Sequence, residues 1–126
     1  MVLNYNVLIV EDNHDVADTT AGVLEAFGFH VRVAYDGTSG LRAALADPPD
    51  AVLCDIRMPG LNGFEVARRI RDGLTPKPLL IAVTASMEQE IVEPAGRAGF
   101  DHYFLKPADP LEIGGLLADH AGGRAH

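Results

Sequence analysis

Short apolar runs alternate along the chain with longer stretches that have helical periodicity. The runs are continuous rather than alternating, which is typical of strands covered on both faces of a parallel sheet. Runs of this kind lie at residues 7–10, 31–34, 51–54, 79–83 and 103–105. The second run is the least apolar, which predicts that it lies nearest an edge of the sheet.

The first helical stretch follows the first apolar run. Asn13 is a suitable N-terminal cap, and Gly28 is suited to end the helix. The apolar positions between them have the spacing of one helical face: Val16, Thr20, Val23, Leu24 and Phe27. We therefore expect this face to pack against the sheet.

The later helical stretches follow the other runs in the same way. They are predicted at residues 38–45, before Pro48; around Phe64, Ala67 and Ile70, up to Gly73; at residues 87–98; and from Pro110, with Asp109 as its cap and Leu111, Leu116 and Leu117 as its apolar positions. Pro94 and Gly96 weaken the fourth helix, and residues 114–115, both glycine, weaken the fifth. Residues 122–126 are expected to fray or to begin a linker, which leaves residues 1–121 as the domain.

Strand–helix pairs in strict alternation predict an α/β fold. Its sheet should be parallel, with helices on both faces and right-handed crossovers between strands. In such folds the functional site lies at the carboxyl ends of the strands. The residues that follow each strand are therefore the candidates for chemistry.

Composition restricts the classes of function. The 126 residues suit one domain, and 48% hydrophobic with 22% charged residues is typical of a globular chain. A net charge of −8 is the wrong sign for a nucleic-acid surface or an anionic membrane. One cysteine excludes an internal disulfide. Neither a signal peptide nor an apolar run of roughly 18 residues is present, so we expect a soluble, cytoplasmic protein.

Polar groups follow four of the five predicted strands. Glu11 and Asp12 follow the first, Asp55 the third, Thr84 the fourth and Lys106 the fifth. Taken singly, each has an ordinary explanation as a helix cap or a turn residue. Because the carboxyl ends of parallel strands meet at one edge, we expect them to form one site.

The expected site has the charges that phosphoryl transfer needs. Crowded carboxylates repel one another unless a cation intervenes, and an oxygen-liganded divalent ion such as Mg²⁺ (or Mn²⁺) meets that need. Lys106 and Thr84 can then neutralise two oxygens of a phosphoryl group, with the metal at the third. Asp55 is the candidate nucleophile, and its product is an acyl phosphate.

The order and spacing of these residues resemble the receiver domains of response regulators over essentially the whole chain. The segment from Asp55 to Gly63 has the form D-x-x-M-P-x-x-x-G, and it is followed by Thr84-Ala85 and Lys106-Pro107. The resemblance implies a flavodoxin-like (βα)5 fold, doubly wound, with a five-stranded parallel sheet in the order 2-1-3-4-5. It also implies a phosphoacceptor switch rather than a multiple-turnover enzyme.

The resemblance implies a role for each matching residue around the metal. Asp55 resembles the phosphoacceptor. Asp12 resembles a direct metal ligand, and Glu11 resembles a ligand that binds through water. The main-chain carbonyl of Arg57 would complete the protein's share of the metal site.

Further roles follow for the residues that sense the phosphoryl group. Lys106 resembles the pairing lysine and is expected to precede a cis peptide bond to Pro107. Thr84 resembles the switch hydroxyl, and Tyr103 the aromatic residue that turns inward with it. The change would reach the face formed by the fourth helix, fifth strand and fifth helix, and alter partner binding there.

The expected partners are a histidine kinase or histidine phosphotransfer domain, and a downstream protein or output domain. A phosphorylation-linked dimer is possible. The chain could be a stand-alone regulator, part of a DNA-binding regulator, or the receiver of a hybrid kinase, and the sequence leaves these three open.

Four further residues lie close to the site residues in sequence. Arg57 and Ser86 lie at positions that line the route of the attacking water in receivers, where a long cation could slow or speed hydrolysis of the acyl phosphate. Cys54 is expected to be a buried strand residue and not a nucleophile, and His14 the first turn of a helix.

Two other functions fit this set of residues less well than the phosphoacceptor switch. Aspartate-dependent phosphatases of another α/β fold place the nucleophile after the first strand and a second acidic residue two positions on, where this chain has Arg57. A receiver-like domain that acts by binding alone is disfavoured by the complete set of pocket residues.

Overall fold

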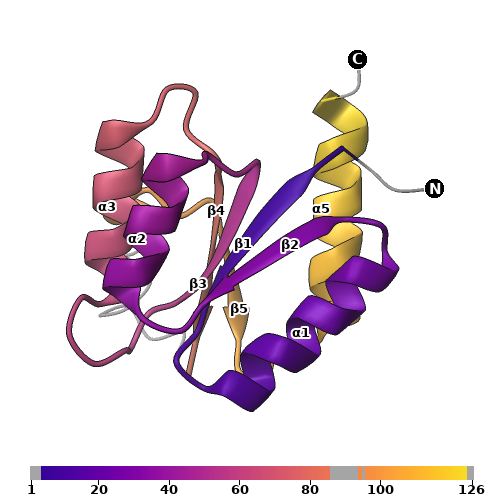
Figure 1. Cartoon of the computed structure of the whole chain (residues 1–126), viewed down its shortest axis with the longest axis horizontal. Helices are drawn as coiled ribbons and strands as arrows, with labels where there is room; N and C mark the ends of the chain where they lie inside the picture. The colour runs from indigo at the N-terminus through magenta and orange to yellow at the C-terminus, as the bar shows by residue number, and fades with distance from the viewer. Residues whose placement is uncertain (1–3, 86–93, 95, 125–126) are drawn as a thin grey trace.

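The computed structural model describes residues 4–85, 94 and 96–124. Five parallel strands form one sheet in the order β2-β1-β3-β4-β5 (Figure 1). The elements are β1 (Asn6–Val10), α1 (His14–Ala26), β2 (His30–Ala34), α2 (Gly37–Ala46), β3 (Ala51–Asp55), α3 (Gly63–Gly73), β4 (Leu79–Thr84), β5 (His102–Leu105) and α5 (Pro110–Arg124). The predicted α/β fold and strand order are confirmed, and β2 lies at an edge as its weaker apolar character indicates.

The helices form a layer on each face of the sheet. Figure 1 shows α1 and α5 on one face and α2 and α3 on the other. Successive strand residues point to opposite faces, so Val7 and Ile9 of β1 pack on the α1–α5 side while Leu8 and Val10 pack on the α2–α3 side. Both layers are therefore closed over an apolar sheet, as the continuous apolar runs predict.

Side-chain caps begin the helices where the sequence predicts them. The Asn13 side chain accepts a hydrogen bond from the Val16 amide at 3.2 Å, and Asp109 Oδ1 accepts one from the Leu111 amide at 2.9 Å. Gly28, with φ of 101°, follows α1 in the left-handed region that favours glycine. Local capping chemistry thus sets these boundaries.

The predicted buried face of α1 was partly wrong. Val16 is 46% exposed, and the residues of α1 that are buried are Ala17, Thr20, Ala21 and Leu24. Val16 lies in the first turn, where it lines a cavity between α1 and α5 and is left uncovered. The buried face is therefore rotated towards the small residues of the helix.

The last two helices differ from the prediction in how far they can be followed or extend. The predicted helix at 87–98 lies largely outside the described residues, of which Pro94 and residues 96–98 are helical. Helix α5 continues through Gly122 and Gly123 to Arg124, where the sequence predicts a frayed tail or linker. No helix in the described ranges is long and apolar enough to cross a membrane.

Candidate functional site

The carboxyl edge of the sheet brings the predicted site residues to one region. Asp55 and Thr84 are the last residues of β3 and β4, Glu11 directly follows β1, and Lys106 directly follows β5. Since β1, β3, β4 and β5 are adjacent and parallel, these ends are neighbours. The alternation of strands and helices therefore builds the site from four separate segments.

Three carboxylates form a cluster at this edge. Glu11, Asp12 and Asp55 each offer an oxygen, and these oxygens all lie within 4.8 Å of one another. Glu11 and Asp55 are both only 5% exposed, whereas Asp12 is exposed. An all-oxygen donor set with one solvent-facing side suits Mg²⁺, which binds few carboxylates and keeps several waters. The residues present therefore fit the metal that the sequence predicts.

Lys106 places an ammonium group between two of these carboxylates. Its Nζ lies 2.9 Å from Asp55 Oδ2 and 3.1 Å from Glu11 Oε1. Partial burial lowers the pKa of Lys106, but the hydrogen bonds and charges of Asp55 and Glu11 outweigh this effect and the pKa lies above its ordinary value. Lys106 therefore stays charged. The peptide bond to Pro107 is cis, as predicted.

Burial strongly perturbs the ionisation of Glu11. Burial raises its pKa from 4.5 to about 7; a hydrogen bond from the Asn13 amide acts in the opposite direction, and Asp55 adds to the rise. Because the folded-state pKa lies above the unfolded value, its contribution to stability is full below pH 4.5 and is lost as the pH rises through about 7. A bound cation would reverse that loss.

Mg²⁺ affinity should therefore rise with pH. The metal prefers ionised Glu11, so a titration should give roughly tenfold weaker apparent binding at pH 6 than at pH 8, with little further gain above that. The measurement is calorimetric or NMR titration with Mg²⁺ across this range. In Glu11→Gln the slope should largely vanish, and an equally steep slope in that variant would show that another group is responsible.

Gly63 positions the main chain around Asp55. A Cβ at Gly63 would lie 2.4 Å from the Asp55 carbonyl oxygen and 2.7 Å from Ile56 Cα. Its amide also donates to the Ile56 carbonyl at 2.9 Å. The start of α3 thus packs directly on the backbone that carries Asp55, and the last position of the D-x-x-M-P-x-x-x-G segment must lack a side chain.

Thr84 ends β4, the strand next to that of Asp55, and Tyr103 lies on β5, one strand further from Asp55. Thr84 is buried, and its carbonyl accepts a hydrogen bond from the Lys106 amide at 2.7 Å. Tyr103 pairs with Ala82 and packs, half-buried, against the core on the α2–α3 side. A Cβ at Gly96 would lie 3.0 Å from the Tyr103 hydroxyl. Both residues are thus placed on the β4–β5 side of the pocket, and their role as a switch stays a prediction.

The neighbours of Asp55 in sequence have different environments. Cys54 is 1% exposed, as expected of a strand residue, and burial raises the pKa of its thiol. Arg57, two residues after Asp55, is exposed. Ser86, the other residue expected along the water route, lies outside the described residues. Because it is buried and its pKa is raised, the Cys54 thiol is unsuited to act as a nucleophile.

One aromatic contact next to the site was missed. The His14 and Tyr35 rings stack with centroids 3.8 Å apart, and the Tyr35 hydroxyl donates to Asp18 Oδ1 at 2.7 Å. That hydrogen bond raises the pKa of Tyr35. The residues lie far apart in sequence, and only the adjacency of β1 and β2 brings them together. The strand order could have indicated this contact. Tyr35 directly follows β2, and β2 lies beside β1, the strand that precedes His14.

Comparison with known proteins agrees with this architecture. Residues 7–117 match the response regulator receiver domain family. The transcriptional regulatory protein CseB of Streptomyces coelicolor is 38% identical over 94% of this chain and 52% of its own length. The DNA-binding response regulator MtrA of Mycobacterium tuberculosis is 35% identical over 88% of this chain and 48% of its own. This chain therefore spans about half the length of these curated relatives.

Solved structures show the same similarity. The receiver domain of the sensor histidine kinase PA1611 from Pseudomonas aeruginosa superposes with a TM-score of 0.84 and 31% identity, over 94% of this chain and 98% of that one. That structure has a magnesium ion in its active-site cleft. A CheY-like receiver domain from Methanospirillum hungatei gives a TM-score of 0.86 at 27% identity over 96% of each chain.

Proposed function

Because this chain belongs to the response regulator receiver domain family, we propose that it is a phosphoacceptor switch in which Asp55 takes a phosphoryl group from a histidine. The chain is a signalling domain rather than a substrate-turnover enzyme. The observation that carries the proposal is the contact between Lys106 Nζ and Asp55 Oδ2 at 2.9 Å, beside the Glu11–Asp12–Asp55 cluster. These groups supply a nucleophile and a fixed cation at one strand edge.

The transfer follows from these positions. Lys106 holds Oδ2 of Asp55, and the other carboxylate oxygen, Oδ1, attacks phosphorus in line. An O–P bond forms, the P–N bond of the phosphohistidine breaks, and its electron pair stays on the imidazole. Lys106, held by Glu11 as well, is already oriented for a phosphoryl oxygen. Preorganised charge of this kind lowers the barrier without reorganisation during the reaction.

Glu11, Asp12, Asp55 and the main-chain carbonyl of Arg57 are proposed to hold Mg²⁺, or Mn²⁺. When bound, the ion neutralises charge on the phosphoryl group. The Glu11, Asp12 and Asp55 oxygens within 4.8 Å of one another, and the magnesium in the similar PA1611 domain, support this proposal. Without a bound metal ion these carboxylates repel one another, and the Lys106 ammonium offsets part of their charge.

The new charge is proposed to act through Thr84 and Tyr103. Thr84 would move towards the phosphoryl group and Tyr103 would turn inward, so that the population shifts between two states of the surface around β5 and α5. The donor would be a histidine kinase or phosphotransfer domain in the cytoplasm. The signal would pass from this chain to a downstream protein or output domain. Phosphorylation could also promote a dimer of the chain.

Beryllofluoride, a phosphoryl mimic, tests this switch. With Mg²⁺ it should shift the NMR signals of Glu11 and Lys106, and those of the Tyr103 ring. In Thr84→Ala the Glu11 and Lys106 shifts should persist while the Tyr103 shift is lost, because the hydroxyl that follows the charge is gone. Thr38→Ala, in the first turn of α2, is the control. No response in the parent chain would contradict the proposed function, and an unchanged Tyr103 shift in Thr84→Ala would contradict the switch.

A further inference from the structure

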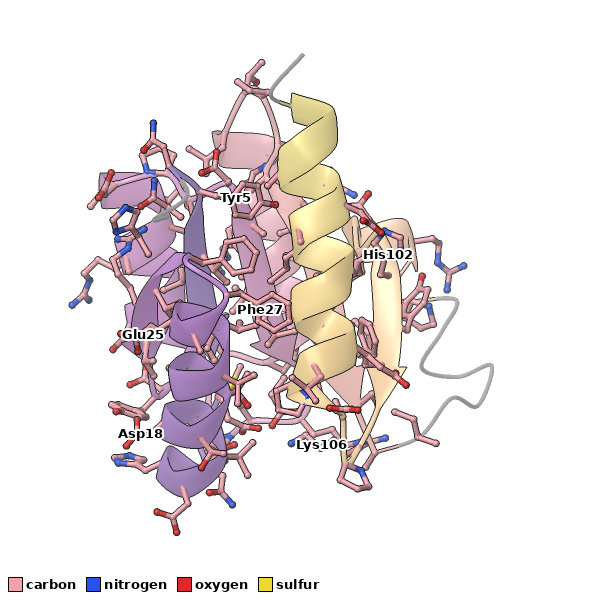
Figure 2. All side chains as sticks on the ribbon, turned by 90° about the vertical axis from the view of Figure 1, so that its right-hand side faces the viewer. Tyr5, Asp18, Glu25, Phe27, His102 and Lys106 are labelled. Carbon is pink, nitrogen blue, oxygen red and sulfur yellow. The ribbon has the colours of Figure 1, made fainter. Side chains whose placement is uncertain are left out.

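A cavity of about 660 Å³ lies between α1 and α5 and reaches the carboxylate site. Figure 2 shows the two helices side by side, with Phe27 between them and Lys106 near their N-terminal ends. A Cβ at Gly114 would lie 2.4 Å from the Phe27 ring, so that glycine lets the helices approach there. Nearer the site, Ala17, Thr20 and Ala108 line the cavity with short side chains, which leave the space unfilled.

The walls and the end of the cavity differ in chemistry. Apolar side chains from the sheet and both helices form most of the lining, among them Ile9, Leu53, Val83, Val16, Pro110 and Ile113. The charged lining residues are Glu11, Asp15, Asp55 and Lys106. Three carboxylates against one ammonium give this cavity an excess of negative charge. An occupant should therefore combine an apolar body with a positive group.

The volume favours a small molecule over a single inserted side chain. Small-molecule sites typically enclose roughly 300–1,000 Å³, with apolar walls and a few convergent polar groups. The cavity falls within this range and has that composition.

We propose that this cavity binds a small amphiphilic cation, with its apolar body between α1 and α5 and its ammonium or amidinium group at the Glu11 and Asp55 carboxylates. Such a ligand would compete with Mg²⁺ for the same carboxylates and so inhibit phosphorylation. The competition rests on the proposed function, whereas binding of the cation does not.

Benzamidine is a suitable probe, with benzamide and benzoate as its neutral and anionic counterparts. Titration of the full chain without metal, followed by NMR, should give saturable shifts at Ala17, Thr20 and Ile113. Benzamidine should bind at least about tenfold more tightly than benzamide because its amidinium pairs with carboxylates. Benzoate should not saturate. Equal affinity for benzamidine and benzamide would overturn the cationic ligand class.

Three substitutions in α1 test whether benzamidine binds in this cavity. Thr20→Leu should weaken benzamidine binding at least about tenfold by filling the cavity. Val16→Phe, at an exposed position of the lining, should act in the same direction where Thr20→Leu folds poorly. Ala26→Leu adds similar bulk at an exposed position of the same helix and should bind like the parent. Unchanged binding in both cavity variants, with folding checked by thermal unfolding, would overturn the proposal.

A titration with Mg²⁺ distinguishes a failure of the cavity proposal from a failure of the proposed function. Because the two ligands would compete for the same carboxylates, the apparent Kd of benzamidine should rise linearly with the concentration of free Mg²⁺. If Mg²⁺ alone leaves the Glu11 and Asp12 signals unchanged, the proposed metal site is wrong while the binding of benzamidine stands. If Mg²⁺ binds and benzamidine does not, the cavity proposal is wrong and the proposed function stands.

Discussion

A variant in which Asp55 is replaced by asparagine is expected to form no acyl phosphate with acetyl phosphate and Mg²⁺, whereas the parent chain does. The asparagine amide keeps the size of the side chain but removes the anionic oxygen that attacks phosphorus. The expected loss is complete within detection. Intact-protein mass spectrometry after a short reaction measures it directly.

The same variant has a second readout that reports on the site. The Asp55 hydrogen bond and charge help to raise the pKa of Glu11, so that pKa should fall in Asp55→Asn. Carbon-detected NMR of the Glu11 carboxyl measures this change. Asp119→Asn, an exposed aspartate on α5, is the control for both readouts. Persistent modification of Asp55→Asn with a normal pKa fall would assign the acceptor to another residue.

Replacing Lys106 with methionine should slow phosphorylation on the order of 100- to 1,000-fold, the usual cost of removing one preorganised donor. The methionine keeps the length and apolar stem of the side chain but leaves Asp55 and Glu11 without their ammonium at 2.9 and 3.1 Å. Since Lys106 competes with a divalent ion for these oxygens, Mg²⁺ affinity should stay equal or increase. Time courses with acetyl phosphate and Mg²⁺ titrations measure the two effects.

Lys77→Met is the matched control for this experiment. Lys77 is the chain's other lysine and pairs with Asp101 Oδ2 at 2.6 Å, before β4 and away from the carboxyl edge. Its removal should leave the phosphorylation rate near that of the parent. A Lys106→Met variant that lost Mg²⁺ binding in parallel with phosphorylation would indicate that Lys106 organises the metal site rather than the phosphoryl group.

The architecture could be predicted because its signals are local. Continuous apolar runs predicted the parallel strands, and Asn13 and Asp109 were recognised as caps from residue type and position alone. The site followed because parallel strands place their carboxyl ends together, so Asp55 and Lys106 could be paired from strands that are distant in sequence. The cis peptide at Pro107 and the strand order came from the family resemblance.

The remaining features depend on how helices pack, and the sequence pattern does not contain that information. Val16 has the spacing of the buried face of α1, yet it is exposed because α1 and α5 approach at Phe27 and Gly114 and leave a cavity near the site. The stacking of His14 on Tyr35 likewise depends on the neighbouring ends of β1 and β2. Gly63 was recognised as part of a motif, but its contact with the Asp55 carbonyl required the structure.

The identity of the phosphorylated residue is the most direct test of the central claim. The parent chain is treated with acetyl phosphate and Mg²⁺, the acyl phosphate is reduced with borohydride to homoserine, and the modified residue is located by peptide sequencing. The account predicts modification at position 55 alone, abolished when Mg²⁺ is chelated. Reduction products at Glu11 or Asp12 instead, or none at any carboxylate despite bound Mg²⁺, would contradict it.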